Sequence, residues 1–133
     1  MEILQEGKFK ESVPVVMTIE RLEGEELAWT WKTEYNSEKY QVTKDYILKM
    51  EDVESNRFTL DEGDGILLYE YQFGDKLYSA FEVQGNYLTS SYELVGEHLV
   101  FEISSGKRIE GDTEGVVSYS VLNVQKVVLS RRP

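Results

Sequence analysis

The sequence predicts an all-β fold, an antiparallel up-and-down meander of about nine or ten strands that forms a barrel or half-barrel with very little helix. Three observations support this fold class. Apolar and aromatic residues recur at every second position, glycine-containing dipeptides separate these runs, and no segment repeats its apolar residues with a 3.6-residue period. A two-sheet sandwich is the alternative architecture. The regular short turns favour the barrel, which also hides its strand edges.

Length and composition place further bounds on the chain. The 133 residues are expected to form a single domain, 1–133, and the absence of cysteine leaves no disulfide and no thiolate ligand. A formal net charge of −11 repels phosphate backbones and anionic lipid, so we expect no nucleic-acid partner and no membrane partner. Without an apolar leader or a long apolar run, the expected location is cytoplasmic.

The first half of the chain contains alternating runs after a weakly patterned start over 1–12. Pro14 lacks the N–H that a sheet ladder needs, so we expect it at the opening of a strand. Trp29 and Trp31 fall on the same face of the next run, whose alternation predicts a half-buried strand. The strands expected here cover 7–9, 15–22, 27–35 and 40–50.

A meander is predicted over 57–103, where each strand is followed by a turn dipeptide. The turns are placed at Asp64-Gly65, Gly74-Asp75, Gly85-Asn86 and Gly96-Glu97. Alternation assigns Glu70 to the outer face. The inward set of the meander is then Tyr69, Tyr71, Phe73, Leu77, Ser79, Phe81, Val83, Leu88, Ser90, Tyr92, Leu94, Leu99, Phe101 and Ile103.

The end of the chain combines a loop and a final strand. Residues 104–115 are rich in glycine and polar side chains, which is typical of a long loop. The last run, 116–129, changes parity, and a β-bulge near Val121-Leu122 would explain that change.

Aromatic side chains gather on the face that alternation assigns to the barrel interior. Tyrosine hydroxyls on an apolar wall need hydrogen-bond partners, which a bound molecule can supply. Arg21 shares the parity of this face and could hold a ligand carboxylate. The alternative is that the rings simply fill the interior. The residues predicted to bind a small hydrophobic ligand are Trp29, Trp31, Tyr69, Tyr71, Phe81, Tyr92, Tyr119 and Arg21.

Other chemistry has weaker support in the sequence, so we assign no catalytic residue, no metal site and no cofactor. His98 is the only histidine and falls on an outward position without a nucleophile motif beside it. Lys126 is a second candidate anchor. The acidic stretches 61–65 and 110–115 do not have EF-hand spacing. Glu70 and Glu82 are expected on a wet outer face, where nothing would raise the pKa of an acid.

The strand number and length resemble the calycin group, which includes lipocalins, fatty-acid-binding proteins and smaller lipocalin-like bacterial domains. Those families open with Gly-x-Trp on the first strand, covered by an Arg or Lys from the last. The nearest match here is Gly7-Lys8-Phe9, with Lys126 or Arg131 as the covering cation. The resemblance implies binding of a hydrophobic ligand.

The leading functional hypothesis is therefore a non-enzymatic protein that binds a small hydrophobic or aromatic molecule in its barrel interior. A protein-interaction domain with a filled core, using an outer patch around Tyr78 and Tyr87, is the first alternative. An enzyme on the same barrel is the second, and its expected mark is an inward carboxylate beside Arg21. Edge strands, predicted at the start of the chain and at 40–50, leave a homodimer open.

Overall fold

The computed structural model describes residues 1–63, 65–111 and 114–132, and its strands form one antiparallel sheet that curls into a half-barrel. None of the described residues is helical, which confirms the predicted all-β meander. The eleven strands are β1 (Glu2–Gln5), β2 (Lys8–Ser12), β3 (Val15–Arg21), β4 (Ala28–Asn36), β5 (Gln41–Asp52), β6 (Arg57–Gly63), β7 (Ile66–Phe73), β8 (Lys76–Val83), β9 (Asn86–Val95), β10 (His98–Lys107) and β11 (Asn123–Ser130).

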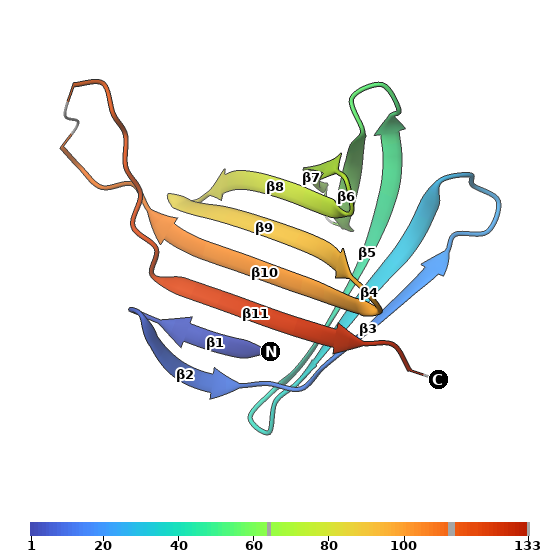
Figure 1. Ribbon diagram of the computed structural model, residues 1–133, viewed down its shortest axis with the longest axis horizontal. Coiled ribbons are helices and arrows are strands. Elements are labelled where there is room, and N and C mark those ends of the chain that lie inside the picture. Colours follow the sequence, from blue (N-terminus) through green and yellow to red (C-terminus); the bar gives the residue numbers. More distant parts are fainter. Residues whose placement is uncertain (64, 112–113, 133) are drawn as a thin grey trace.

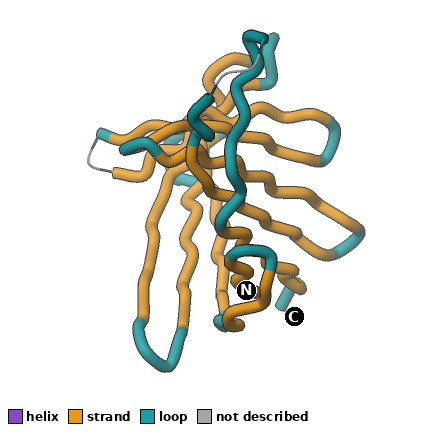
Figure 2. Tube along the Cα trace, turned by 90° about the vertical axis from the view of Figure 1, so that its left-hand side faces the viewer, coloured by secondary structure: helices purple, strands orange, loops and turns teal. Residues whose placement is uncertain are grey.

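The strand order is β2-β1-β11-β10-β9-β8-β7-β6-β5-β4-β3, so neighbours in sequence are mostly neighbours in the sheet. In Figure 1, β3, β4 and β5 cross steeply behind the strands from β8 to β11. Figure 2 shows the hairpins leaving the centre of the molecule in different directions, as a curled sheet requires. Among the described residues, no helix is long and apolar enough to cross a bilayer.

Turn chemistry explains why there are eleven strands and not nine or ten. Glu6 and Gly7 both have positive φ, 51° and 75°, which is the two-residue turn that joins strands with the natural twist. The expected single lead-in strand is therefore the hairpin β1–β2. A similar turn lies at Gln84-Gly85, one residue before its predicted position, with φ of 49° and 79°. The predicted turn residue Asp64 lies outside the described residues.

The core lies where the two groups of strands cross. Its buried members come from β4, β5 and β6, and Tyr92 of β9 packs against them from the other side. The rings of Trp31 and Tyr92 meet edge to face with centroids 5.0 Å apart, and Tyr92 stacks on Phe101 at 4.5 Å. The space between the crossing strands is thus filled by side chains at this level. The buried cluster consists of Trp31, Leu48, Phe58 and Leu60.

The predicted face of β7 is wrong. Tyr69 and Phe73 are 52% and 69% exposed, whereas Glu70 between them is 1% exposed. The cause is the turn: Phe73 pairs with Lys76 across Gly74-Asp75, and residues opposite each other in an antiparallel pair share a face. Leu77 points inward, so its partner Gln72 and hence Glu70 belong to the inner face, while Tyr69, Tyr71 and Phe73 belong to the outer face.

The chain passes directly from one edge of the sheet to the other. β2 leads into β3 through Val13 and Pro14, where Val13 is 1% exposed and its N–H donates to the Met1 carbonyl at 2.6 Å. Pro14 precedes the first residue of β3, as its missing N–H predicts. The edge strands are β2 and β3. The expectation that 40–50 forms an edge is wrong, because β5 pairs with β4 on one side and β6 on the other.

The last hairpin also departs from prediction. β10 continues to Lys107, into the predicted loop, and β11 begins only at Asn123. Between them Ser120 crosses over β10, where its N–H donates to the Lys107 carbonyl at 2.8 Å. This close crossing requires glycine at position 106, since a Cβ there would lie 1.6 Å from the Ser120 carbonyl oxygen.

Candidate functional site

A hollow lies between β7 and β8, and its lining comes from these two strands and from β9 and β10. These two strands of eight residues pair only at Tyr71–Tyr78, Gln72–Leu77 and Phe73–Lys76, and then separate in a V. The cleft between them has a volume of about 750 Å³ and opens to solvent. Its lining is Leu67, Leu68, Tyr69, Tyr71, Phe73, Tyr78, Ser79, Ala80, Phe81, Thr89, Ser90, Ser91, Glu102 and Ser104.

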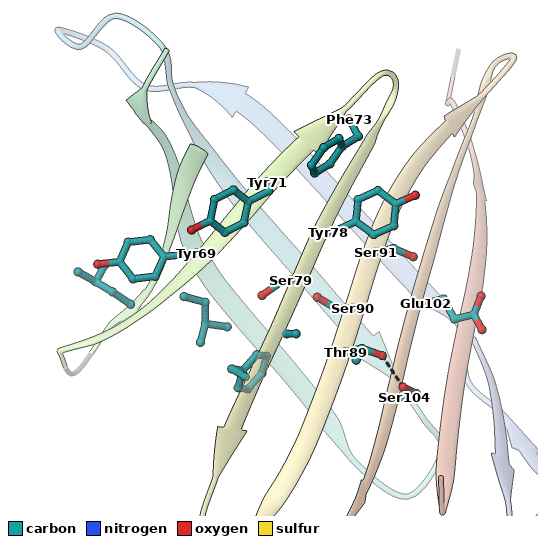
Figure 3. Close-up of a pocket in the computed structure, with 14 residues that line it drawn as sticks. Tyr69, Tyr71, Phe73, Tyr78, Ser79, Thr89, Ser90, Ser91, Glu102 and Ser104 are labelled. Carbon is teal, nitrogen blue, oxygen red and sulfur yellow. Dashed lines mark hydrogen bonds between the residues drawn. The ribbon is translucent and has the colours of Figure 1, made fainter. Parts of the chain in front are cut away.

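The outer rim of the cleft is aromatic. Tyr69, Tyr71, Phe73 and Tyr78 stand on outward positions of β7 and β8, and Figure 3 shows Phe73 and Tyr78 nearest the β7–β8 turn. The rings of Phe73 and Tyr78 meet edge to face with centroids 5.9 Å apart. Because all four side chains remain between 39% and 69% exposed, they present ring faces that a ligand could cover.

Two cations border this rim without lining the cleft. Arg57 of β6 lies over the Tyr69 ring, with its Cζ 5.2 Å from the ring centroid. Lys76 lies over Tyr78, with Nζ at 4.9 Å, and also forms an ion pair with Glu93 at 3.7 Å. Each positive charge therefore already faces a tyrosine ring, although the Arg57 Nε has no hydrogen-bond partner.

The inner wall of the cleft belongs to the opposite face of the sheet. Leu68, Ser79, Phe81 and Ser90 reach it from inward positions, and Ser79 lies opposite Ser90 in the β8–β9 pair. Ser79 is only 6% exposed, and its Oγ has no hydrogen-bond partner. A buried hydroxyl without a partner loses its hydration without compensation, so this atom is a ready contact for a polar ligand group.

Main-chain groups along the cleft are polar as well. The Gln72 N–H donates to the Asn56 carbonyl at 2.9 Å, so alternate residues of β7 point their main-chain groups at β6. The remaining alternate residues point theirs at the cleft, where the ladder with β8 has ended. On the two strands these are Leu67, Tyr69, Ala80 and Glu82.

Glu70 is the largest fully buried side chain and lies on the inner face of β7, beside the end of the ladder. Its Oε2 has no hydrogen-bond partner. In the described part of the chain no lysine or arginine forms an ion pair with it. Burial, and then the nearby Glu62, raises the pKa of Glu70 to about 8. The predicted position of Glu70 on a wet outer face is thus wrong.

Two tyrosines of the core, Tyr46 and Tyr92, have hydroxyls whose pKa values the buried Glu70 and its neighbour Glu62 affect. Burial, and then Glu70, raises the pKa of the Tyr92 hydroxyl above its ordinary value. The pKa of Tyr46 is raised by burial and then by Glu62. The inner face therefore holds neutral acids at neutral pH, which can donate hydrogen bonds that carboxylates cannot.

The structure brings three of the eight predicted ligand-binding residues together in the cleft, namely Tyr69, Tyr71 and Phe81. Trp29, Trp31 and Tyr92 belong to the core or pack against it. The other two lie elsewhere, as described next.

Tyr119 stacks on Tyr87 with centroids 4.3 Å apart. Arg21 is exposed at the end of β3, beside a smaller hollow of about 400 Å³ formed with 22–26. The mark expected of an enzyme, an inward carboxylate beside Arg21, is absent among the described residues around that hollow, where Glu23, Glu25 and Glu26 are all exposed. Lys126 is exposed on the outer face of β11.

The remaining candidate sites have simple structural roles. His98 is exposed at the start of β10, where its Nδ1 lies 3.3 Å from the Ser130 Oγ. Phe9, the residue that matches the calycin tryptophan, is 63% exposed. Within the described residues, no group of three or more His, Asp or Glu side chains is placed to hold a metal ion.

Sequence reasoning missed Ser79 as a polar contact and Phe73, Tyr78 and Glu70 as parts of the site. One signal was available. A two-residue turn at Gly74-Asp75 forces Phe73 opposite Lys76, so Phe73 and Leu77 cannot share a face. Applying that rule would have turned Glu70 inward.

Comparison with protein-family models, with characterised proteins and with solved structures gave no significant match. The cleft is therefore interpreted from its own chemistry.

Proposed function

We propose that this chain is a cytoplasmic, non-enzymatic protein that binds a small hydrophobic or aromatic molecule in the cleft between β7 and β8. The observation that carries the proposal is the combination of an open 750 Å³ hollow, four exposed aromatic rings and a buried hydroxyl without a partner. Ligand sites commonly join apolar walls to a few placed polar groups. The lipocalin-like architecture supports the same class of ligand but a different location, the barrel interior.

Apolar burial supplies the driving term for such a ligand. Covering about 200 Å² of apolar ligand surface contributes roughly 5 kcal/mol before the costs of association. The rings of Tyr71 and Tyr78 lie opposite each other on adjacent strands and can contact a flat molecule from neighbouring positions. Ser79 offers one hydrogen bond that fixes the orientation of the ligand.

The test compares two tyrosines of equal exposure. Tyr71 lines the cleft and is 39% exposed, whereas Tyr40 lies between β4 and β5 and is 40% exposed. Aromatic fragments that bind the wild type are first found in a thermal-shift and NMR screen. For these fragments we expect Tyr71→Ala to raise Kd by roughly fivefold, or about 1 kcal/mol. Tyr40→Ala should leave Kd unchanged. Equal effects of both variants, or no binding by any fragment, would contradict the proposal.

The same aromatic rim also favours a second candidate, a protein-interaction surface. Phe73 is 69% exposed, and solvent-exposed rings of this kind are common at protein interfaces. A second copy of the chain is the simplest partner. If light scattering shows a dimer that Phe73→Ser converts to a monomer, this candidate displaces the small-molecule proposal. A monomer at all concentrations leaves the rim free for a ligand.

A further inference from the structure

The cleft has a negative electrostatic character. Among its described lining residues there is no lysine or arginine, and Glu102 supplies a carboxylate. Two cations at the rim, Arg57 and Lys76, lie over tyrosine rings, and Lys126 stands opposite Glu102 on β11. The whole chain carries a net charge of −11, which attracts cations and repels anions on approach.

Ser79 lines this cleft at its inner level, whereas Glu70 is not one of the lining residues: it stands between the lining residues Tyr69 and Tyr71, with its buried side chain on the inner face of β7. Continuing the β7–β8 register by one pair beyond Tyr71–Tyr78 places Glu70 opposite Ser79, and both side chains belong to the inner face. Each carries a buried oxygen without a hydrogen-bond partner. The ladder ends at this level, so no strand pairing closes the sheet between the cleft and the two oxygens.

We propose that the ligand of the cleft is a small cationic amine with an apolar or aromatic body, whose ammonium pairs with Glu70 and donates to Ser79. This inference rests on the proposed function, because it names the ligand class for the same cleft. The body of the amine lies against the rings of Tyr69, Tyr71 and Tyr78.

The donor and acceptor inventory favours an ammonium over other head groups. An ammonium has three donors, and both unpartnered oxygens can accept. Tyrosine faces also attract cations. An anionic head group would be repelled by Glu62 and Glu102, and a neutral alcohol would gain no charge pairing.

Binding by this route releases a proton. In the empty protein Glu70 is mostly neutral at pH 7, because burial and Glu62 raise its pKa to about 8. The amine arrives protonated, the Glu70 carboxyl loses its proton to solvent, and an ammonium–carboxylate pair forms. Glu62 and Tyr92 are the titratable groups that act on Glu70 or respond to it, and both remain in place.

Three probes with a shared phenyl ring test the inference: 2-phenylethylamine, 2-phenylethanol and 3-phenylpropanoate. At pH 7 we expect calorimetry to give the amine at least a tenfold lower Kd than the alcohol, with the propanoate weakest. Titrations in phosphate and in Tris should report release of about 0.9 proton per amine bound, from a carboxyl pKa of about 8. Glu70→Gln should remove both the preference and the proton release.

Glu97→Gln is the matched control, since it makes the same change of side chain in the exposed β9–β10 turn. It should change neither the preference nor the proton count. Equal binding of amine and alcohol, or amine binding without proton release, overturns the inference and leaves the cleft as an apolar site. If none of the three probes binds, the proposed function fails together with the inference. The proton count on the wild type decides the matter even if Glu70→Gln does not fold.

Discussion

Replacing Glu70 with glutamine should change how the stability of the protein depends on pH. Glu70 is 1% exposed and its pKa is raised from 4.5 to about 8. A difference of about 3.5 pH units between the unfolded and folded states, at about 1.4 kcal/mol per unit, amounts to roughly 5 kcal/mol. That free energy is what the fold loses when the buried carboxyl ionises.

The direction follows from where the proton is bound. Below pH 4.5 the carboxyl is protonated in both states and has no effect on stability. Between about 4.5 and 8 the unfolded chain has lost this proton while the folded chain keeps it, so rising pH favours unfolding. Above pH 8 both states are ionised and the loss is complete. Glutamine carries no titrating proton, so Glu70→Gln should abolish this part of the slope.

Urea unfolding followed by tryptophan fluorescence at pH 5, 6, 7 and 8 measures the effect. We expect the free energy of unfolding of wild type, relative to Glu70→Gln, to fall by about 1.4 kcal/mol per pH unit between pH 5 and 8. The difference isolates Glu70 because the other titrating groups are shared. Glu97→Gln, on an exposed turn, should run parallel to wild type. Parallel curves for Glu70→Gln as well would refute the claim that this carboxyl is buried and unpaired.

Two further substitutions test the packing. Leu60 lies in the core and is 4% exposed, so Leu60→Ala should lower the free energy of unfolding in urea by roughly 2 to 5 kcal/mol. The control is Leu67→Ala: Leu67 is 54% exposed, and its replacement should change that free energy by less than about 1 kcal/mol. Gly106→Ala places a Cβ against the Ser120 carbonyl and should cost about 3 kcal/mol or more by the same measurement; a variant as stable as wild type would show that Ser120 does not cross β10 so closely.

The fold class could be predicted because its signals are local. Glycines at positive φ, such as Gly74, Gly85 and Gly96, mark hairpins wherever they stand between alternating runs. Trp29 and Trp31 could be assigned to one face because alternation in β4 is unambiguous. Local signals of this kind require no knowledge of which strands meet in space.

The site could be predicted only in part, because β7 offers apolar residues on both faces. Its outward Tyr69, Tyr71 and Phe73 look more hydrophobic than the inward set that contains Glu70. Hydrophobicity alone therefore chose the wrong face, and burying a carboxyl contradicts the average behaviour of that side chain. The cleft itself arises where two strands stop pairing, a tertiary event that leaves no mark on residue alternation.

The short β7–β8 ladder is a candidate hinge between the two halves of the sheet. Only three residue pairs connect β7 to β8, while on the inner face the Trp31–Tyr92 contact also holds the two halves of the sheet together. A ligand that separates β7 from β8 more widely must also strain the Trp31–Tyr92 contact, because the two rings belong to β4 on one side of the cleft and β9 on the other. We therefore expect a guest that changes the angle between the two halves of the sheet to change the indole emission of Trp31.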